Sequence, residues 1–141
     1  LKWKRKTGWI EVTVGVVQEN EKLHALSPSL TVAEGAVLSL EEKFQGGTGV
    51  NMTPPPGKFV KPASLERAKK AVEIVAETLG IEGYCRADAF LNIDSGDIIL
   101  IEVNTLPGLT PSTVLFHQAL AEEKPLYPKQ LLEKFIQNKG Y

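Results

Sequence analysis

The feature that most constrains the fold is a pair of apolar, strand-like runs separated by a short turn signal. The runs lie on either side of Asp94-Ser95-Gly96. A three-residue loop with Gly at its third position is typical of a hairpin that closes through a left-handed residue. With that loop, Ile93 faces Asp97, and every other facing pair is fixed in turn. The chain is therefore predicted to contain an antiparallel hairpin over residues 84–93 and 98–104.

This register sorts the side chains of the hairpin by their chemistry. It places Asp88 opposite Glu102 and Arg86 opposite Asn104 on one face. The opposite face is apolar, with Ala87, Ala89 and Leu91 facing Val103, Ile101 and Ile99. A two-residue loop would put the two carboxylates on opposite faces, so the clean apolar face favours the three-residue loop. We expect a polar cluster at the open end of the hairpin.

The two opposed carboxylates need a compensating charge, because cross-strand partners lie about 5 Å apart and like charges repel. Carboxylate and amide oxygens suit a hard divalent cation, and Mg²⁺ takes one or two carboxylates together with substrate phosphates. Arg86 shares their face and could hold an oxyanion or a phosphate. The alternative is that Arg86 only neutralises Asp88 and Glu102 in a surface salt bridge.

The segment after the hairpin favours the functional alternative. Asn104-Thr105-Leu106-Pro107-Gly108 turns toward a helix predicted over residues 110–122, with Thr110 as its cap and Pro111 in its first turn. The start of a helix binds anions through its free N–H groups. Ser112 and Thr113 would lie in the first turn, where their hydroxyls either hold a carboxylate or cap the helix.

The remaining pattern predicts an α+β fold, an antiparallel sheet with packed helices. Residues 9–17 alternate as a strand, and residues 23–30 form a return strand broken by Pro28. An apolar face predicts a helix over 64–79, capped by Ser64 and stopped by Gly80. A last helix begins at Tyr127-Pro128, with an apolar stripe of Leu131, Leu132, Phe135 and Ile136. Residues 41–62 break every period and are either a surface loop or a lid over a site.

Composition sets outer limits on the function. The 141 residues carry a net charge of −1, which gives no basic excess for nucleic acid or an acidic membrane surface. No apolar run reaches the ~18 residues of a membrane helix, and no signal peptide is visible. Cys85 is the only cysteine, which excludes an intrachain disulfide and a multi-cysteine zinc site and indicates a reducing compartment.

The stretch GYCRADAFL…ILIEVNTLPGLTPST, from Gly83 to Thr113, resembles the C-terminal signature of the D-alanine–D-alanine ligases of the ATP-grasp superfamily. EVTV at 11–14 and EEKF at 41–44 extend the resemblance over nearly all of the chain. The segment EEKFQGGTGVNMTPPP is most similar to plant-type members of the family. This similarity implies a location in the plastid stroma, whereas a bacterial protein would be cytoplasmic. The resemblance implies an ATP-grasp C-terminal subdomain.

The resemblance also implies a role for individual residues. Asp88, Glu102 and Asn104 would bind Mg²⁺ or Mn²⁺, and Arg86 and the Gly108 N–H would stabilise a tetrahedral intermediate. Glu11 would hold the ATP ribose and Ile101 would line the adenine pocket. Lys43 and Phe44 match the lid pair over the phosphates and the second substrate. The serine that commonly holds the second substrate's carboxylate falls on Thr113, beside Ser112.

The implied reaction is ATP-dependent ligation of two D-alanines through an acyl phosphate, a step of peptidoglycan and cell wall synthesis. The N-terminal and central ligase domains lie before the matched stretch, so residues 1–141 are predicted to be inactive alone and to work with the remainder of the chain, commonly as a homodimer. Two alternatives stay open: an ATP-grasp ligase for another substrate pair, and a non-catalytic nucleotide- or metal-binding module.

Overall fold

The sheet at the centre of the molecule is antiparallel throughout. The computed structural model describes residues 7–32 and 50–137. In these ranges the strands are β1 (Trp9–Glu19), β2 (Lys22–Ala25), β3 (Ser29–Val32), β4 (Val50–Met52), β5 (Tyr84–Asn92) and β6 (Ile98–Asn104). Their order is β4-β3-β1-β5-β6, and β2 also pairs with β1. The helices are α3 (Pro62–Thr78), α4 (Val114–Leu120) and α5 (Pro128–Gln137), so the α+β prediction is confirmed.

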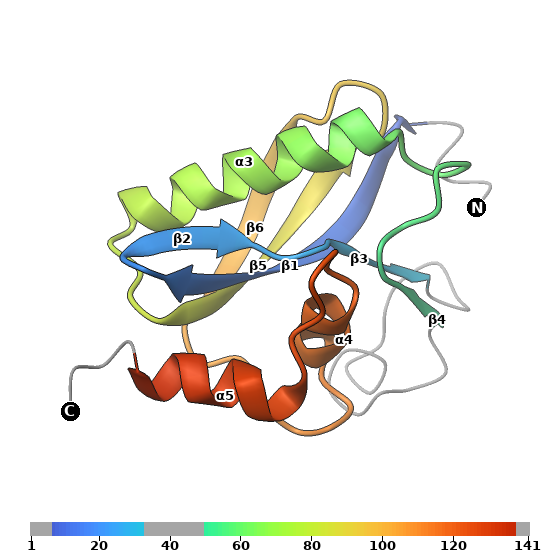
Figure 1. Ribbon diagram of the computed structural model, residues 1–141. Coiled ribbons are helices and arrows are strands. Elements are labelled where there is room, and N and C mark those ends of the chain that lie inside the picture. Colours follow the sequence, from blue (N-terminus) through green and yellow to red (C-terminus); the bar gives the residue numbers. More distant parts are fainter. Residues whose placement is uncertain (1–6, 33–49, 138–141) are drawn as a thin grey trace.

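The helices cover the two faces of the sheet separately (Figure 1). α3 lies along one face and buries Leu65, Ala68, Val72 and Ala76 against alternate residues of β1 and β5. α4 and α5 lie on the other face, where Leu115, Phe116, Leu131 and Phe135 form a second apolar cluster. This second cluster covers only part of its face, which leaves room there for polar side chains of the central strands.

β1 organises the sheet because it pairs with β2, β3 and β5. Its even-numbered residues from Ile10 to Val16 are buried, as the alternation predicted. Asn20 and Glu21 both have positive φ, which is typical of the tight turn that joins twisted strands. The predicted return strand is interrupted as expected near Pro28, so that β2 and β3 pair with different parts of β1.

β4 was not predicted. It lies within the range 41–62, where the pattern showed no period, and it pairs with β3 through Leu30↔Met52. Three residues are too few to show an alternation, and the partner strand is distant in the sequence. The rest of this range includes residues outside the described part of the chain.

α3 begins two residues earlier than predicted, because Pro62 occupies its first turn and Lys61 is its N-cap. Ser64 is therefore not the cap; its hydroxyl donates to the carbonyl of Asp94 at 2.9 Å and ties the helix to the β5–β6 turn. The predicted stop is confirmed. Gly80 has a φ of +65° and its N–H donates to Glu77, while Ile81 N–H donates to Ala76.

α4 and α5 differ in how well the sequence predicts them. α4 begins at Val114 with Thr113 as N-cap, so the predicted start at Thr110-Pro111 was wrong. α5 begins at Pro128 as predicted, and the Gln130 side chain accepts a hydrogen bond from Tyr127 N–H at 3.0 Å. Of its predicted apolar stripe only two residues are buried, whereas Leu132 and Ile136 stay exposed. The buried pair is Leu131 and Phe135.

α5 is attached to β1 by an ion pair whose contribution depends on pH. Lys134 Nζ donates a hydrogen bond to Glu19 Oε1, and this bond lowers the pKa of Glu19 below 4.5. A carboxyl with a lowered folded-state pKa stabilises the fold above its unfolded pKa, and the contribution is lost as pH falls through the folded pKa. We expect Glu19→Gln to lower the free energy of unfolding by about 0.2–1 kcal/mol at pH 7. Urea unfolding from pH 7 downward should show this difference shrinking below about pH 4.5; a constant difference would contradict the assignment.

Cys85 lies in β5 within the core beneath α3. It is fully buried, and burial raises the pKa of its thiol to about 11. Because the thiolate is the reactive form, we expect iodoacetamide to label the native chain at pH 8 at least about 100-fold more slowly than the denatured chain. Mass spectrometry of the single cysteine measures both rates. Equal rates in the two states would contradict the burial.

Candidate functional site

The polar cluster spans three adjacent strands, in two rows on the face that α4 partly covers. Thr13 of β1 faces Asp88 of β5, which faces Glu102 of β6. In the neighbouring row, Gly15 faces Arg86, which faces Asn104. The predicted opposition of the two carboxylates, and of Arg86 with Asn104, is confirmed. The structure adds β1 as the third strand of the site.

Asp88 is held at both carboxylate oxygens. Its Oδ1 accepts a hydrogen bond from the Thr13 hydroxyl at 2.9 Å, and its Oδ2 accepts one from Arg86 Nη2 at 3.0 Å. The same guanidinium nitrogen lies 3.9 Å from Glu102 Oε1. The Asp88 side chain is 11% exposed, whereas the Glu102 side chain is 62% exposed. One carboxylate is thus fixed within the sheet and the other remains free to turn toward a ligand.

Arg86 contacts both carboxylates, as the salt-bridge alternative requires, but that pairing leaves part of its guanidinium unused. Its Nε is buried and has no hydrogen-bond partner within the described residues. Buried donors of this kind are rare in native proteins. An additional acceptor on a ligand is therefore compatible with the pairing seen here.

The hairpin has the predicted register at its open end, but its loop and its pairing near the loop differ from the prediction. Asn92 N–H bonds to the Asp97 carbonyl, so the loop contains four residues, Ile93 to Gly96, instead of three. A bulge between Asp88 and Ala89 then leaves Ile101 without a partner and restores the register. Gly96 has a φ of +78°, as predicted for the left-handed position, and a Cβ there would lie 2.7 Å from the Ser64 carbonyl oxygen.

Between loop and bulge, the predicted pairs were wrong by one residue. Ala89 faces Leu100, Phe90 faces Ile99 and Leu91 faces Ile98. Ile98 packs against the core in the place predicted for Ile99, which is 55% exposed. Ile101 likewise leaves the apolar face and is exposed beside Glu102. The bulge thus places an apolar side chain at the edge of the cluster.

The segment after β6 folds back toward the start of α4. The Asn104 side-chain oxygen accepts a hydrogen bond from Leu106 N–H at 3.0 Å. A Cβ on Gly108 would lie 3.5 Å from the Thr113 methyl group, so Gly108 lies beside the N-cap of α4. α4 begins at Val114, so Ser112 and Thr113 precede the helix. The prediction that they lie in its first turn is therefore wrong.

The two predicted substrate hydroxyls differ in their surroundings. Thr113 Oγ1 is buried and has no hydrogen-bond partner in the described part of the chain. Ser112 Oγ is exposed and lies 3.4 Å from the Thr110 hydroxyl. Of the two, Thr113 has the hydroxyl that lacks a partner, which is the expected state of a group that binds a ligand.

Gln118 of α4 was missed by the sequence analysis. Its side chain is fully buried, accepts a hydrogen bond from Gly15 N–H at 2.8 Å and donates to the Thr13 carbonyl at 2.7 Å and the Ser29 hydroxyl at 3.1 Å. The pairing of β1 with β3 ends at Thr13 and its pairing with β2 begins at Val16, and the Gln118 amide bonds to β1 beside this gap. The spacing Leu115, Gln118, Ala119 on a helix face was the available signal.

The other predicted site residues lie as follows. Glu11 faces Phe90, one row beyond Thr13 on the same side of β1, and takes part in an interaction of its own. Lys43 and Phe44 lie outside the described residues. Thr13, Arg86, Asp88, Glu102 and Asn104 thus lie together in the two rows, whereas Glu11 and Ile101 lie elsewhere in β1 and β6, and Gly108, Ser112 and Thr113 lie between β6 and α4.

The cluster presents oxygen atoms of the kind that could hold a hard cation. Asp88 and Glu102 supply carboxylates and Asn104 an amide at the next position of β6. No group of three or more His, Cys, Asp or Glu side chains converges to hold a metal ion within residues 7–32 and 50–137. Two carboxylates with a nearby amide match Mg²⁺ that completes its shell with water and phosphate oxygens. They do not match a closed structural metal site.

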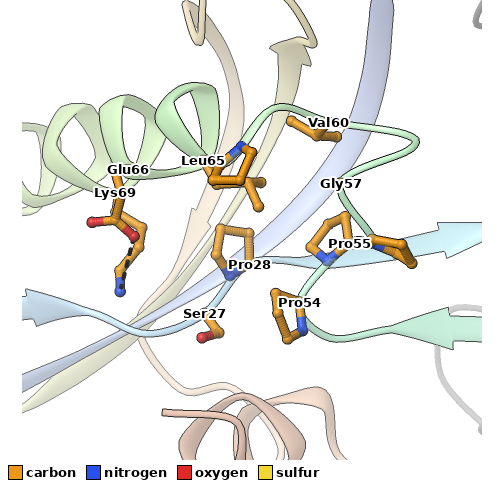
Figure 2. A pocket seen from close by; sticks show the side chains of 11 residues that line it. Ser27, Pro28, Pro54, Pro55, Gly57, Val60, Leu65, Glu66 and Lys69 are labelled. Atoms are coloured by element: carbon orange, nitrogen blue, oxygen red, sulfur yellow. Dashed lines mark ion pairs between the residues drawn. The ribbon is translucent and has the colours of Figure 1, made fainter. Parts of the chain in front are cut away.

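A separate pocket of about 390 Å³ lies between the connection of β2 with β3, the proline run 54–56 and the start of α3 (Figure 2). At one end Lys69 Nζ lies 4.0 Å from Glu66 and 3.7 Å from Glu122. None of the predicted site residues lines it.

The described helices include none long and apolar enough to cross a membrane.

Comparison with known proteins identifies the fold class first. The D-alanine–D-alanine ligase of Coxiella burnetii superposes with a TM-score of 0.69 at 16% identity, over 92% of this chain and 31% of that one. The Bacillus anthracis ligase complexed with ATP gives 0.65 at 22% identity, over 92% and 37%. VanG, a D-Ala:D-Ser ligase of Enterococcus faecalis, gives 0.68 at 23% identity, over 91% and 35%. The chain therefore has the fold of the matched part of these ligases.

Sequence comparison then gives the family. The family model described as D-ala D-ala ligase C-terminus matches residues 5–137. The D-alanine–D-alanine ligase of Nitratidesulfovibrio vulgaris is 38% identical over 114 residues, which cover 79% of this chain and 35% of the relative. That of Lawsonia intracellularis is 30% identical over 127 residues, 90% of this chain and 39% of the relative. The chain belongs to the D-alanine–D-alanine ligase C-terminal family and spans little more than a third of these relatives.

Proposed function

We propose that the chain is the C-terminal part of an ATP-dependent ligase that joins two D-alanine molecules through an acyl phosphate. The observation that carries this proposal is the row Thr13–Asp88–Glu102 with Arg86 between the carboxylates. At one end of the sheet, this row places two carboxylates that can bind a cation beside the Arg86 guanidinium, which can stabilise a developing oxyanion. Family membership supports the same reaction.

In this proposal Asp88, Glu102 and Asn104 hold Mg²⁺ or Mn²⁺, which when bound would offset charge on the phosphate oxygens. Arg86 turns its guanidinium from the carboxylates toward the tetrahedral intermediate, and Gly108 N–H donates to the same oxyanion. Both groups then stabilise charge that grows as the amine attacks. The buried Arg86 Nε, which has no hydrogen-bond partner among residues 7–32 and 50–137, supports such a donor role.

The remaining contacts of the proposal concern binding. The Thr113 hydroxyl, with Ser112 beside it, receives the carboxylate of the second substrate, which its lack of a partner supports. Glu11 holds the ribose and the exposed Ile101 lies against adenine. Lys43 and Phe44, in the lid of about 41–62, cover the phosphates. For the whole protein we propose N-terminal and central ligase domains that complete the site. We also propose a homodimer that lies in a plastid or in the cytoplasm.

A fused protein tests the proposal. Residues 1–141 replace the corresponding C-terminal part of the Nitratidesulfovibrio vulgaris ligase, and ADP release is measured with ATP, Mg²⁺ and D-alanine. We expect D-alanine-dependent ADP release and dipeptide from the fusion and none from the isolated chain. A folded fusion without ligase activity would contradict the proposal, as would rapid ligation by the isolated chain.

The same assay separates the second candidate, a ligase for another substrate pair. The fold similarity to VanG, a D-Ala:D-Ser ligase, makes this comparison specific. D-serine and D-lactate are offered with D-alanine in competition, and the products are separated by mass. Preference for D-alanine supports the proposed pair, whereas preference for either competitor assigns the other. Metal-dependent ADP binding by a folded fusion that forms no dipeptide with any of these substrates would favour a non-catalytic module.

A further inference from the structure

We infer that Thr13 is a positioning residue for the cation site: its hydroxyl fixes the Asp88 carboxylate in the orientation that binds the metal ion. This inference rests on the proposed function, and nothing in the ligand set that the resemblance implies includes Thr13. The observation behind it is the 2.9 Å hydrogen bond from Thr13 Oγ1 to Asp88 Oδ1 across the β1–β5 pair.

Of the two hydrogen bonds to Asp88, the one from Arg86 breaks in the proposed reaction, whereas the one from Thr13 remains. Arg86 Nη2 holds Oδ2 at 3.0 Å but also lies 3.9 Å from Glu102, and in the proposed reaction it turns to the oxyanion. Thr13 has no such second role. When Arg86 turns away, the Thr13 bond is the one that still fixes the carboxylate plane. Each carboxylate oxygen has two acceptor sites, so these bonds leave room for a cation on either oxygen.

Thr13 is itself held firmly. Its main chain lies between β5 and β3, where it faces Asp88 and Ser29, and its carbonyl accepts a hydrogen bond from Gln118 at 2.7 Å. A β-branched side chain in a strand has a restricted χ1, so the hydroxyl is oriented before any ligand arrives. Fixed partners of this kind around a metal ligand typically account for 10–100-fold in metal affinity.

A merely structural role is the competing explanation, since Asp88 is nearly buried and needs hydrogen bonds in any case. The two roles differ in what the loss of the hydroxyl changes. A structural role alters the stability of the fold, whereas a positioning role alters cation affinity in a chain that remains folded. Rescue by a side chain that keeps the hydroxyl is expected only if the hydrogen bond itself matters.

The test measures Mn²⁺ binding to the 141-residue chain by electron paramagnetic resonance, with urea unfolding as the check on folding. We expect Thr13→Val, which keeps the shape, to raise the Kd for Mn²⁺ by about 10–100-fold, and Thr13→Ser to restore it to within about threefold. Thr13→Ala is the second variant without the hydroxyl and should match Thr13→Val. Thr78→Val, which removes an exposed α3 hydroxyl, is the matched control and should leave the Kd unchanged.

Each outcome has a definite meaning. An unchanged Kd in both Thr13→Val and Thr13→Ala overturns the positioning role, even if Asp88→Asn abolishes binding and so supports the proposed site. An equal rise in the Kd for Mn²⁺ in Thr13→Ser and Thr13→Val also overturns the positioning role, because the hydroxyl would then not affect cation binding. If wild type and Asp88→Asn bind Mn²⁺ equally, the proposed cation site fails and the role of Thr13 fails with it.

Discussion

Replacing Asp88 with Asn in the fused ligase is expected to lower kcat by about 1000-fold. Asn has the shape of Asp and can still accept the Thr13 hydrogen bond, so the sheet should remain intact. It lacks the charge that attracts a cation and orients Arg86 at 3.0 Å. Charge stabilisation at such sites amounts to several kcal/mol, and each 1.4 kcal/mol corresponds to a factor of ten in rate.

Steady-state ADP release across a range of Mg²⁺ concentrations measures this effect, and circular dichroism checks the fold. Asp97→Asn is the matched control, because Asp97 is an exposed carboxylate at the other end of the hairpin, 2.8 Å from Arg67. Its kcat should stay within about twofold of wild type, as for surface substitutions generally. A fully active Asp88→Asn variant would contradict the assignment of Asp88 as a cation ligand.

The open end of the hairpin could be predicted because three independent signals agree there. The turn residues, the alternation and the clean apolar face all favour a register with Asp88 opposite Glu102; the structure confirms this pair, although the three-residue loop and the predicted apolar pairs near the turn are wrong. The bulge could not be predicted from the same signals. One extra residue in the loop and one in the bulge offset each other, so the spacing between Asp88 and Glu102 is unchanged and gives no sign of either.

The errors at the helix starts have a different cause. Thr110-Pro111 and Ser64 both fit helix-start preferences, but local preference is weak against packing. At Thr113 the chain reaches the sheet face only after the Gly108 loop has folded back, so α4 begins there. Thr13 and Gln118 could not be placed because their partners are 75 and 89–105 residues away in the sequence.

Replacing Gln118 with Leu is expected to lower the free energy of unfolding by about 2–6 kcal/mol, a large fraction of the 5–15 kcal/mol typical of a domain. Leu fills a similar volume, so a cavity contributes little. The loss comes from the Gly15 N–H and the Thr13 carbonyl, which lose the Gln118 amide as a partner, whereas the Ser29 hydroxyl keeps its hydrogen bond with the Thr53 hydroxyl. Buried polar groups left unsatisfied cost about 1–3 kcal/mol each.

Urea unfolding measures the loss, and His117→Leu is the matched control, because His117 is the exposed neighbour of Gln118 in α4 and should change stability by less than about 0.5 kcal/mol. Hydrogen exchange gives a local readout. The Gly15 amide donates to Gln118, so in Gln118→Leu it should exchange faster than the amides of β1 that pair with β5. A stable variant with a protected Gly15 amide would show that another group bonds to Gly15 N–H. Faster exchange of the Gly15 amide in a chain that remains folded would instead confirm Gln118 as its hydrogen-bond acceptor.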